Sequence, residues 1–388
     1  MIFRTAIAVL LLNAWNMSAQ SLMIPERYDP SRLAVSPLYK QDTVKIRFFG
    51  DIMMHSLQID TARGKDGSFD FSTYYELMED YLADSDLNVG NMEFTLGGEP
   101  YSGYPAFSAP DSYAYYLADA GFNLFLCANN HIFDKGRNGL IRTLDIYRKL
   151  AESHGIQHTG AAADEAAEAC NNPLIINVKG VRIAFMNATY GTNLGLPTAW
   201  PQTNRISETG KIAEAMAKAR SGADIVLVLP HWGTEYNLKH SEAQEKTAFR
   251  LAEEGADMII GAHPHVIQDC QMIQIERNGR LEAVPVAYSL GNAVSNMSAA
   301  DTQLELMATI KIIRKKNGDI VTGPIEFTYL WCSRPGGYNG SYTVLPVLKH
   351  IGKKEKWEGV WEYDKMVTTY ERVKNITGIK DKQDIANE

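Results

Sequence analysis

The sequence has few cysteines, and they follow no recognisable pattern. The four cysteines among 388 residues are widely spaced and form no CxxC pair. This spacing excludes the usual cysteine zinc sites and the dense disulfide framework of small secreted domains. The residues that carry chemistry are therefore expected among the carboxylates, histidines and amides.

Positive charge is also scarce. Lys and Arg total 38 against 46 Asp and Glu, which gives a net charge of -8. This balance argues against nucleic acid as a partner, because binding to its backbone depends on clustered basic side chains. An anionic substrate remains compatible with the charge, since a bound metal ion can supply local positive charge.

Apolar runs long enough to cross a bilayer are absent as well. Residues 1–19 are instead typical of an export signal, with Arg4 before the short apolar run Ala6–Leu12 and small residues at Ser18-Ala19 for cleavage. An uncleaved anchor at the membrane interface is the alternative. We expect an exported protein, periplasmic or at the cell surface, with residues 20–43 as an extended lead-in.

The sequence does contain short polar clusters, each of which directly follows an apolar run. Their residue types are those that bind divalent metals or transfer protons. The clusters are Gly50–His55, Gly90–Glu93, Asn129–Asp134, His231–Gly233 and Gly261–His265. Because all five stand where strands are expected to end, they predict one metal site assembled from distant segments.

Strands and amphipathic helices alternate through residues 44–295. Helices are expected from Asp111, with its side chain as the cap, and from Ser241, which forms a capping box with Gln244. The expected strands are Val44–Phe49, Asp86–Val89, Asn123–Ala128, Val181–Asn187, Ile225–Leu229 and Asp257–Ile260. This alternation predicts an α/β fold with its sheet covered on both faces, where ligands gather beyond the carboxyl ends of the strands.

Residues 296–388 have a different sequence pattern, with paired strands in place of alternating strands and helices. Two long strands are expected at Leu304–Ile313 and Ile325–Trp331, with a hairpin turn at Asn317-Gly318 between them and a helix near Val367–Asn375. No comparable polar cluster occurs here. We therefore interpret this region as a strand-rich extension that packs on the main domain.

Six side chains in the clusters are candidate metal ligands. Mixed oxygen and nitrogen donors suit Zn, Mn or Fe better than Ca or Mg. Six ligands are too many for one catalytic zinc, but they fit two divalent ions that share a carboxylate. Two ions about 3.5–4 Å apart can hold the attacking and leaving oxygens of a displacement and activate a water. The candidates are Asp51, Glu93, Asn130, His231, His263 and His265.

Each candidate also has a structural alternative. Asp51 could cap a turn, Glu93 could be a surface charge and His231 could be a satisfied interior histidine. Asn91 and Asn129 are interpreted as turn residues. The joint occurrence of the clusters favours the metal interpretation, and Pro264 is expected to hold the last loop stiff and aim its two histidines.

His131 and Asp134 are the candidate catalytic pair. His131 follows a proposed ligand and is placed to give a proton to a leaving oxygen. Asp134 could orient the ring, as carboxylates commonly do for imidazoles. The alternative, equally supported by the sequence, is that Asp134 caps the turn before Gly136.

Over residues 44–295 the chain resembles the CapA-type family of bacterial capsule synthesis proteins, named for poly-gamma-glutamate biosynthesis. That family is similar to the calcineurin-like metallophosphoesterases. The motifs that carry the resemblance are Gly50–Met53, Asn91–Glu93, Asn129–His131 with Asp134 and Gly136, His231–Gly233, Gly261–His265 and Ser289–Asn292. The resemblance implies a four-layered αββα sandwich, metallo-dependent phosphatase-like.

The resemblance also implies how the ligands are divided. Asp51 and His265 would hold one ion, and Glu93 would bridge to the other. The second ion would be held by Asn130, His231 and His263. His131 would donate the proton. His55 is left outside the predicted ligands, because three residues separate it from Asp51 where metallophosphoesterases have one.

Together these features predict an exported metal-dependent hydrolase, phosphoesterase-like, that acts in capsule or poly-gamma-glutamate biosynthesis. The alternative is a non-catalytic polymer-binding or assembly component with a structural or vestigial metal site. Hydrolysis of an amide bond in such a polymer is a third reading. The expected partners are an anionic surface polymer or phosphoester substrate and a membrane-associated capsule synthesis machinery.

Overall fold

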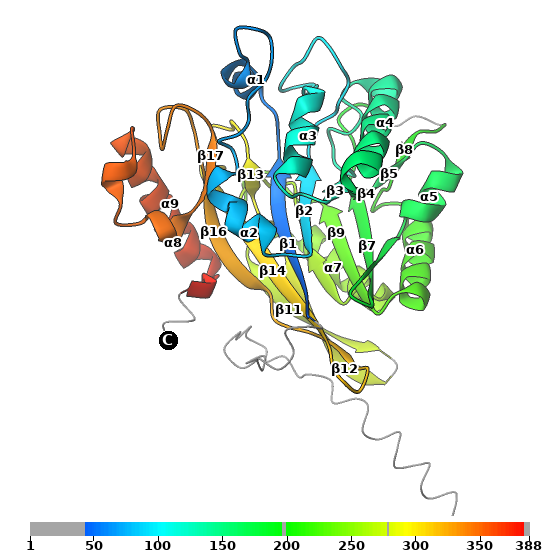
Figure 1. The fold of residues 1–388 in the computed structure, drawn as a ribbon. Helices are drawn as coiled ribbons and strands as arrows, with labels where there is room; N and C mark the ends of the chain where they lie inside the picture. The colour runs from blue at the N-terminus through cyan, green and yellow to red at the C-terminus, as the bar shows by residue number, and fades with distance from the viewer. Residues whose placement is uncertain (1–42, 196–198, 278, 384–388) are drawn as a thin grey trace, which may run out of the picture.

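A computed structural model describes residues 43–195, 199–277 and 279–383. The expected export signal and nearly all of the lead-in therefore lie outside the described residues. No helix in the described ranges is both long and apolar enough to cross a membrane. The described chain forms two large β-sheets that pack face to face, with helices on their outer sides (Figure 1). The prediction of a four-layered αββα sandwich is confirmed.

The first sheet has nine strands, in the order β17-β16-β14-β1-β2-β3-β4, with β13 and β15 paired to β1 and β14. The neighbours β1, β2, β3 and β4 are parallel, so their carboxyl ends lie at one edge. The strands are β1 (Thr43–Ile52), β2 (Leu87–Met92), β3 (Leu124–Leu126), β4 (Gln157–Thr159), β13 (Asn292–Val294), β14 (Leu304–Arg314), β15 (Ile320–Thr322), β16 (Glu326–Ser333) and β17 (Thr343–Pro346).

The second sheet has six strands, in the order β11-β12-β10-β9-β7-β6. Its four central strands are parallel, and an antiparallel strand closes each edge. The strands are β6 (Leu174–Val178), β7 (Val181–Thr189), β9 (Ile225–His231), β10 (Met258–Ile260), β11 (Cys270–Arg277) and β12 (Arg280–Ala287). The short strands β5 (Ala161–Ala162) and β8 (Gln202–Thr203) pair separately.

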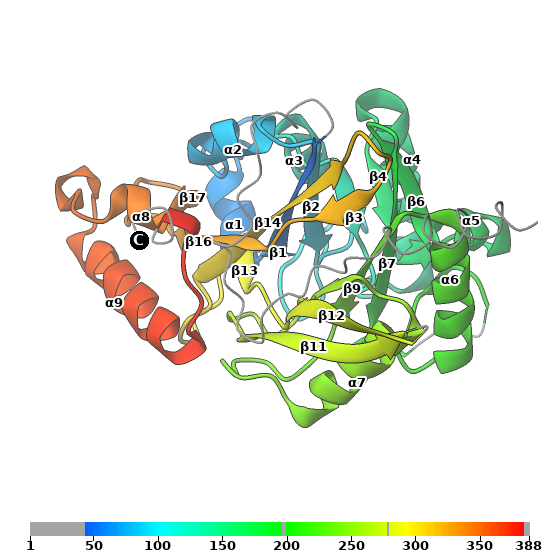
Figure 2. The same ribbon diagram turned by 90° about the horizontal axis from the view of Figure 1, so that it is seen from below.

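Helices cover both outer faces, as Figure 2 shows from below. Four of them, α1 (Ser56–Ala62), α2 (Glu79–Ala83), α3 (Asp111–Asp119) and α4 (Gly136–His154), share a buried core with the first sheet. The second sheet packs against α6 (Thr209–Gly222) and α7 (Glu242–Glu254). The remaining helices are α5 (Glu165–Asn171), α8 (Val347–His350) and α9 (Val360–Thr377), with short 3-10 turns at Glu76–Met78 and Lys354–Lys356.

Strand β9 shows why its sequence is apolar without interruption. Ile225, Leu227 and Leu229 face the core between the two sheets. Val226 and Val228 face the opposite side, toward the helices. Because side chains alternate along a strand, a strand buried on both faces needs apolar residues at every position.

Two predicted helix starts have different outcomes. Ser241 and Gln244 form the expected capping box at the start of α7, and Gly255 follows its end. The prediction that Asp111 caps α3 is wrong, because Pro110 occupies the cap position and makes no side-chain bond. Asp111 is the first helical residue instead, and its carboxylate pairs with Arg142 at 2.6 Å.

The region after residue 295 contributes strands to the first sheet. β14 pairs with β1 and β16, and the predicted turn at Asn317-Gly318 lies between β14 and β15. The terminal helix α9 begins at Val360, earlier than the expected Val367. It packs on β16, where the ring centroids of Tyr370 and Tyr329 lie 5.0 Å apart. The strands of this region are therefore part of the first sheet.

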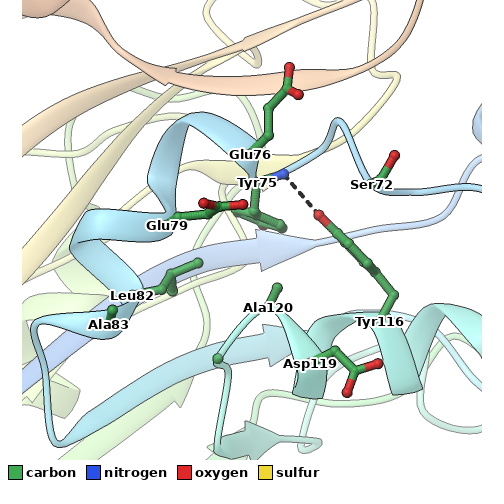
Figure 3. A pocket seen from close by; sticks show the side chains of 10 residues that line it. Ser72, Tyr75, Glu76, Glu79, Leu82, Ala83, Tyr116, Asp119 and Ala120 are labelled. Atoms are coloured by element: carbon green, nitrogen blue, oxygen red, sulfur yellow. Dashed lines mark hydrogen bonds between the residues drawn. The ribbon is translucent and has the colours of Figure 1, made fainter.

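An open hollow of about 510 Å³ lies on the outer helical side, between the Glu76–Ala83 segment and the end of α3. The hydroxyl of Tyr116 accepts a 2.9 Å hydrogen bond from the backbone N–H of Tyr75 beside it (Figure 3). Three exposed carboxylates, those of Glu76, Glu79 and Asp119, line it. It is separate from the polar clusters, since none of their residues lines it.

Candidate metal centre

The six predicted ligands come together where the carboxyl ends of the two sheets meet. Three come from the first sheet, at the end of β1, directly after β2 and after β3, and three come from β9 and the loop after β10. Each is at most 3% exposed. In chain order they are Asp51, Glu93, Asn130, His231, His263 and His265.

Glu93 lies at the middle of this group. Its Oε1 is 3.6 Å from Nε2 of His231 and 3.6 Å from Nε2 of His265. Nε2 of His231 is also 2.8 Å from Oδ1 of Asn130, and Nδ1 of His265 is 3.2 Å from Oδ2 of Asp51. The separations bring carboxylate, imidazole and amide donors within reach of a shared cation.

Two sets of three side chains offer ligand atoms within 4.8 Å of one another. One set is Glu93, His263 and His265, and the other is Asp51, Glu93 and His231. Glu93 belongs to both, as a bridging carboxylate would. The sets divide the histidines differently from the resemblance, although His265 also lies close to Asp51.

The unpartnered atoms of the centre fit a cation. Both carboxylate oxygens of Glu93 and Nδ1 of His263 are buried without a hydrogen-bond partner. Burial raises the pKa of Glu93 well above its usual value, and the nearby charge of Asp51 raises it further. Leaving such groups buried and unpaired is costly, and a divalent ion would satisfy them. The donor set is one that Zn, Mn or Fe accepts.

The surroundings shift the pKa values of the three histidines in different directions. Burial lowers the pKa of His231 well below its usual value, and the charge of His263 adds to this. Burial also lowers the pKa of His263, to about 3, with a further contribution from His265. Burial opposes protonation of His265 as well, but its hydrogen bond to Asp51 and the charge of that carboxylate raise its pKa. Neutral imidazoles at His231 and His263 are the form that binds metals.

The loop that carries His263 and His265 has an unusual backbone. Both residues adopt positive φ, +100° and +59°, on either side of Pro264. Residues other than glycine rarely occupy this region, and they do so at a cost in free energy. Two hydrogen bonds hold the loop, from the N–H of His263 to Asp51 Oδ2 (3.2 Å) and from the N–H of Tyr236 to the carbonyl of Pro264 (2.9 Å).

Two asparagines orient the ligands, and the sequence did not reveal their roles. Asn91 lies inside β2 and not in a turn, and its Nδ2 donates to Asp51 Oδ1 at 2.7 Å and lies 3.1 Å from Nδ1 of His231. Oδ1 of Asn292 is 2.9 Å from Nδ1 of His265. Partners of this kind fix the direction of a ligating ring. For Asn292, the available signal was its place in the Ser289–Asn292 motif.

A close backbone approach supports the edge at Asp51. A Cβ built on Gly50 would lie 1.9 Å from the carbonyl oxygen of Gly291. That carbonyl accepts a 2.9 Å hydrogen bond from the N–H of Asp51. Only glycine fits at position 50, so the glycine before Asp51 lets β13 approach β1 and brings Asn292 beside the centre.

His131 and Asp134 form a buried pair beside the centre. Nδ1 of His131 lies 2.7 Å from Oδ2 of Asp134, which also accepts a 2.7 Å hydrogen bond from the N–H of Phe107. Lys135 occupies the cap position of α4 and makes no side-chain cap bond. The carboxylate of Asp134 faces Nδ1 of the histidine, and Nε2 lies 3.4 Å from the side-chain nitrogen of Asn193. Asn193, which the sequence did not indicate, places its side-chain nitrogen 3.4 Å from this ring.

His55 lies close by with other partners. Its Nδ1 is 3.2 Å from Gln58 Oε1 and 3.3 Å from the N–H of Asn296. Burial lowers the pKa of His55 to about 4. Within the described ranges, it belongs to neither set of convergent ligands.

Three exposed tyrosines contact the buried histidines from the solvent side. The ring of Tyr190 lies 4.6 Å from that of His263, measured between centroids. Tyr104 is 6.5 Å from His131 and Tyr236 is 6.4 Å from His265. All three tyrosines are at least 47% exposed. They mark the side from which a substrate would reach the centre, and the sequence offered no periodic signal for them.

The sequence matches known proteins over most of its described length. Residues 45–297 match the family described as bacterial capsule synthesis protein PGA_cap. The capsule biosynthesis protein CapA of Bacillus anthracis is 30% identical over 67% of this chain and 62% of its own length. The PGA biosynthesis protein CapA of Bacillus subtilis (strain 168) is 28% identical over 75% of this chain and 72% of its own. The match thus spans less than two thirds of the B. anthracis relative.

Two solved nucleotidases are distantly similar to this chain. The Haemophilus influenzae NAD nucleotidase is 12% identical, with a TM-score of 0.44 over 86% of this chain and 67% of that one. The 5'-nucleotidase of Candida albicans SC5314 is 11% identical, with a TM-score of 0.40 over 74% of this chain and 52% of that one. Likenesses of this size carry no information about substrates or acting residues.

Proposed function

Because this chain belongs to the bacterial capsule synthesis protein family PGA_cap, we propose that it is a metal-dependent hydrolase that acts in capsule or poly-gamma-glutamate biosynthesis. The observation that carries the proposal is the convergence of six buried ligand side chains, with both oxygens of Glu93 unpartnered at their centre. The names of the two CapA relatives, which refer to capsule and PGA biosynthesis, support the polymer context. The substrate is an anionic surface polymer or a phosphoester formed during its assembly.

The cofactor in this proposal is a pair of divalent ions, Mn, Zn or Fe. Asp51 and the three histidines would hold them, with Glu93 shared, and Asn130 would join them from beside His231. When bound, such ions polarise the bond under attack and lower the pKa of a water to the neutral range. Asn91 and Asn292 keep Asp51, His231 and His265 aimed inward.

His131 is the proposed proton donor. Asp134 accepts from Nδ1 of the ring and is itself fixed by the N–H of Phe107, so the imidazole is held in one orientation. A proton on Nε2 can then pass to the departing oxygen. Tyr104, Tyr190 and Tyr236 border the approach to the buried histidines.

We place this reaction outside the cytoplasm, in the periplasm or at the cell surface. The support is the sequence of residues 1–19, where Arg4, an apolar run and the small residues Ser18-Ala19 follow the order of an export signal. A membrane-associated capsule synthesis machinery is the expected partner there.

Metal analysis combined with hydrolysis assays tests the proposal. The purified protein is expected to bind divalent metal and to cleave phosphomonoester or phosphodiester substrates, and the His263→Ala, His265→Ala double variant is expected to lose both properties. His154→Ala serves as the matched control, because His154 lies on α4 and pairs with an exposed carboxylate. Full activity in the double variant would reject the proposal.

The same assays separate the other readings. A γ-linked glutamate oligomer in the substrate panel distinguishes amide hydrolysis from phosphoester cleavage. A non-catalytic binding component would hold metal and polymer but cleave no bond. In that case His131→Ala would bind the polymer as tightly as the wild type.

A further inference from the structure

Arg334 directly follows β16, outside the segment that matches the family. The residue is half-buried, and its side-chain atoms Nε and Nη2 are buried and have no hydrogen-bond partner. No ion pair involves this arginine within the described residues. A guanidinium is always charged, and leaving two of its buried N–H groups without an acceptor is costly. The arrangement is therefore one that an anionic ligand would complete.

A neighbouring carboxylate is already occupied. Glu362, on α9, accepts hydrogen bonds from the backbone N–H of Arg334 (3.0 Å), from Ser333 Oγ (3.1 Å) and from Gln303 Nε2 (2.7 Å). A Cβ built on Gly337 would lie 1.3 Å from Glu362 Oε2, so the loop after β16 is packed tightly against this side chain. Glu362 holds the backbone of that loop and leaves Nε and Nη2 of Arg334 without a partner.

Contacts connect this loop to the candidate centre. Cys332 Sγ lies 3.7 Å from the carbonyl of Ser295, which places the end of β16 beside the Ser295-Asn296 segment. Oδ1 of Asn296 accepts from the hydroxyl of Tyr342 (2.8 Å), and its N–H reaches Nδ1 of His55 (3.3 Å).

The charges that act on His55 agree with the contacts that run from this loop through Asn296 to His55. Burial is the main cause of the lowered pKa of His55, and the charges of His265, His131 and Arg334 each lower it further. The charges of the candidate centre and of Arg334 thus both act on His55.

We propose that Arg334 binds an oxyanion of the substrate beside the metal centre. This rests on the proposed function for the identity of the reacting site. A guanidinium presents parallel N–H groups that match a carboxylate or a phosphate in a bidentate manner, which a lysine ammonium does not. The segment after residue 295 therefore completes the substrate site in addition to extending the sheet.

Calorimetric titration with two probes tests the inference. The probes are inorganic phosphate and a γ-linked glutamate trimer, titrated at fixed ionic strength into metal-loaded and chelated protein. Arg334→Gln is expected to weaken binding of at least one probe roughly tenfold or more, as loss of a charged hydrogen bond does. Arg148→Gln, a matched change at an exposed ion pair on α4, is expected to stay within about twofold of the wild type.

The arms of the experiment distinguish the outcomes. Loss of phosphate binding alone identifies a phosphoester as the ligand, and loss of trimer binding alone identifies the polymer carboxylates. Arg334→Lys keeps the positive charge but removes the parallel N–H groups of the guanidinium. If this variant binds the probes more weakly while its melting temperature and metal content are unchanged, the loss is one of recognition and not of folding. Equal affinities in wild type, Arg334→Gln and Arg334→Lys, or no binding of either probe by the wild type, would overturn the inference.

The inference and the proposed function fail separately. If the protein held no metal and cleaved no bond, anion binding that depends on Arg334 would still be measurable in the chelated protein. If Arg334→Gln bound both probes normally in a metal-loaded protein that cleaves phosphoesters, only the role of Arg334 would be lost.

Discussion

Carboxylates gather at two places in this molecule, and their surroundings are opposite. In the hollow between the Glu76–Ala83 segment and α3, the carboxylates of Glu76, Glu79 and Asp119 are exposed to solvent (Figure 3). At the candidate centre Asp51 and Glu93 are fully buried, and both oxygens of Glu93 lack a partner. Water stabilises an exposed carboxylate, whereas a buried one needs a counter-charge or a proton. Burial, and not the number of acidic residues, therefore distinguishes the candidate metal site.

The largest expected effect concerns Glu93. Glu93→Gln keeps the size of the side chain but removes the charge that both sets of ligands share. We expect metal affinity to fall by more than about 100-fold, beyond the loss seen when only a supporting partner is removed. Metal content after dialysis and calorimetric titration measure this. The metal-free variant should fold as stably as the wild type, because burial already favours the protonated form of Glu93.

Glu79→Gln makes the same chemical change in the exposed hollow and serves as the control. It is expected to leave metal affinity unchanged. The contrast between the two places would break down if Glu93→Gln kept the full metal content, or if both variants lost it equally.

An intermediate effect is expected for Glu305, a buried carboxyl on β14 whose Oε1 accepts from the N–H of Gly50 at 2.7 Å. Burial raises the pKa of Glu305 to about 8. From about pH 4.5 to pH 8 the folded protein then holds a proton that the unfolded chain has released. The free energy of unfolding therefore falls as the pH rises through this window, by an amount on the order of a few kcal/mol.

Chemical unfolding of the metal-free protein at pH 5 and at pH 8.5 measures this contribution. Glu305→Gln stays neutral and keeps an acceptor for Gly50, so its unfolding free energy should fall less over the same interval. Parallel pH curves for the wild type and the variant would show that Glu305 does not hold the proton.

The smallest effect is expected in the hollow itself. Glu79→Gln and Asp119→Asn replace exposed carboxylates, so each should change the free energy of unfolding by no more than about 0.5 kcal/mol. Thermal or urea unfolding measures the change. If either variant lowered the free energy of unfolding by more than about 1 kcal/mol, these carboxylates would have structurally important partners. The difference between the exposed hollow and the buried centre would then be smaller than proposed.

The sequence predicted those parts of the fold and the site that depend on local pattern. Apolar runs located β1, β9 and β14, and the polar residues after the runs located the six candidate ligands. The capping box at Ser241 was predicted because both of its partners lie within four residues of each other. In each case the deciding interaction joins residues that are close in sequence, or it follows from the alternating direction of side chains along a strand.

The misses depend on distant partners. Asn91 resembles a turn residue until His231, which is 140 residues away, is seen beside its amide. Asp111 does not cap α3, because Arg142 on the neighbouring helix holds its carboxylate. One miss is local: the hairpin of β11 and β12 was not predicted, although the Asn278-Gly279 pair in the sequence is a typical turn signal. Arg334 was missed because nothing in its local sequence shows that Glu362, 28 residues away, bonds its backbone N–H and not its guanidinium.

The six candidate ligands are divided evenly between the two sheets, with Asp51, Glu93 and Asn130 on one layer and the three histidines on the other. An occupied centre would therefore link the two sheets at the end of the sandwich where the carboxyl ends of their strands meet. Chelation should then loosen that end first, so amide protons of β1 and β9 near it should exchange faster while the opposite end stays protected. The availability of metal would in this way determine the protein's resistance to proteolysis as well as its ligand binding.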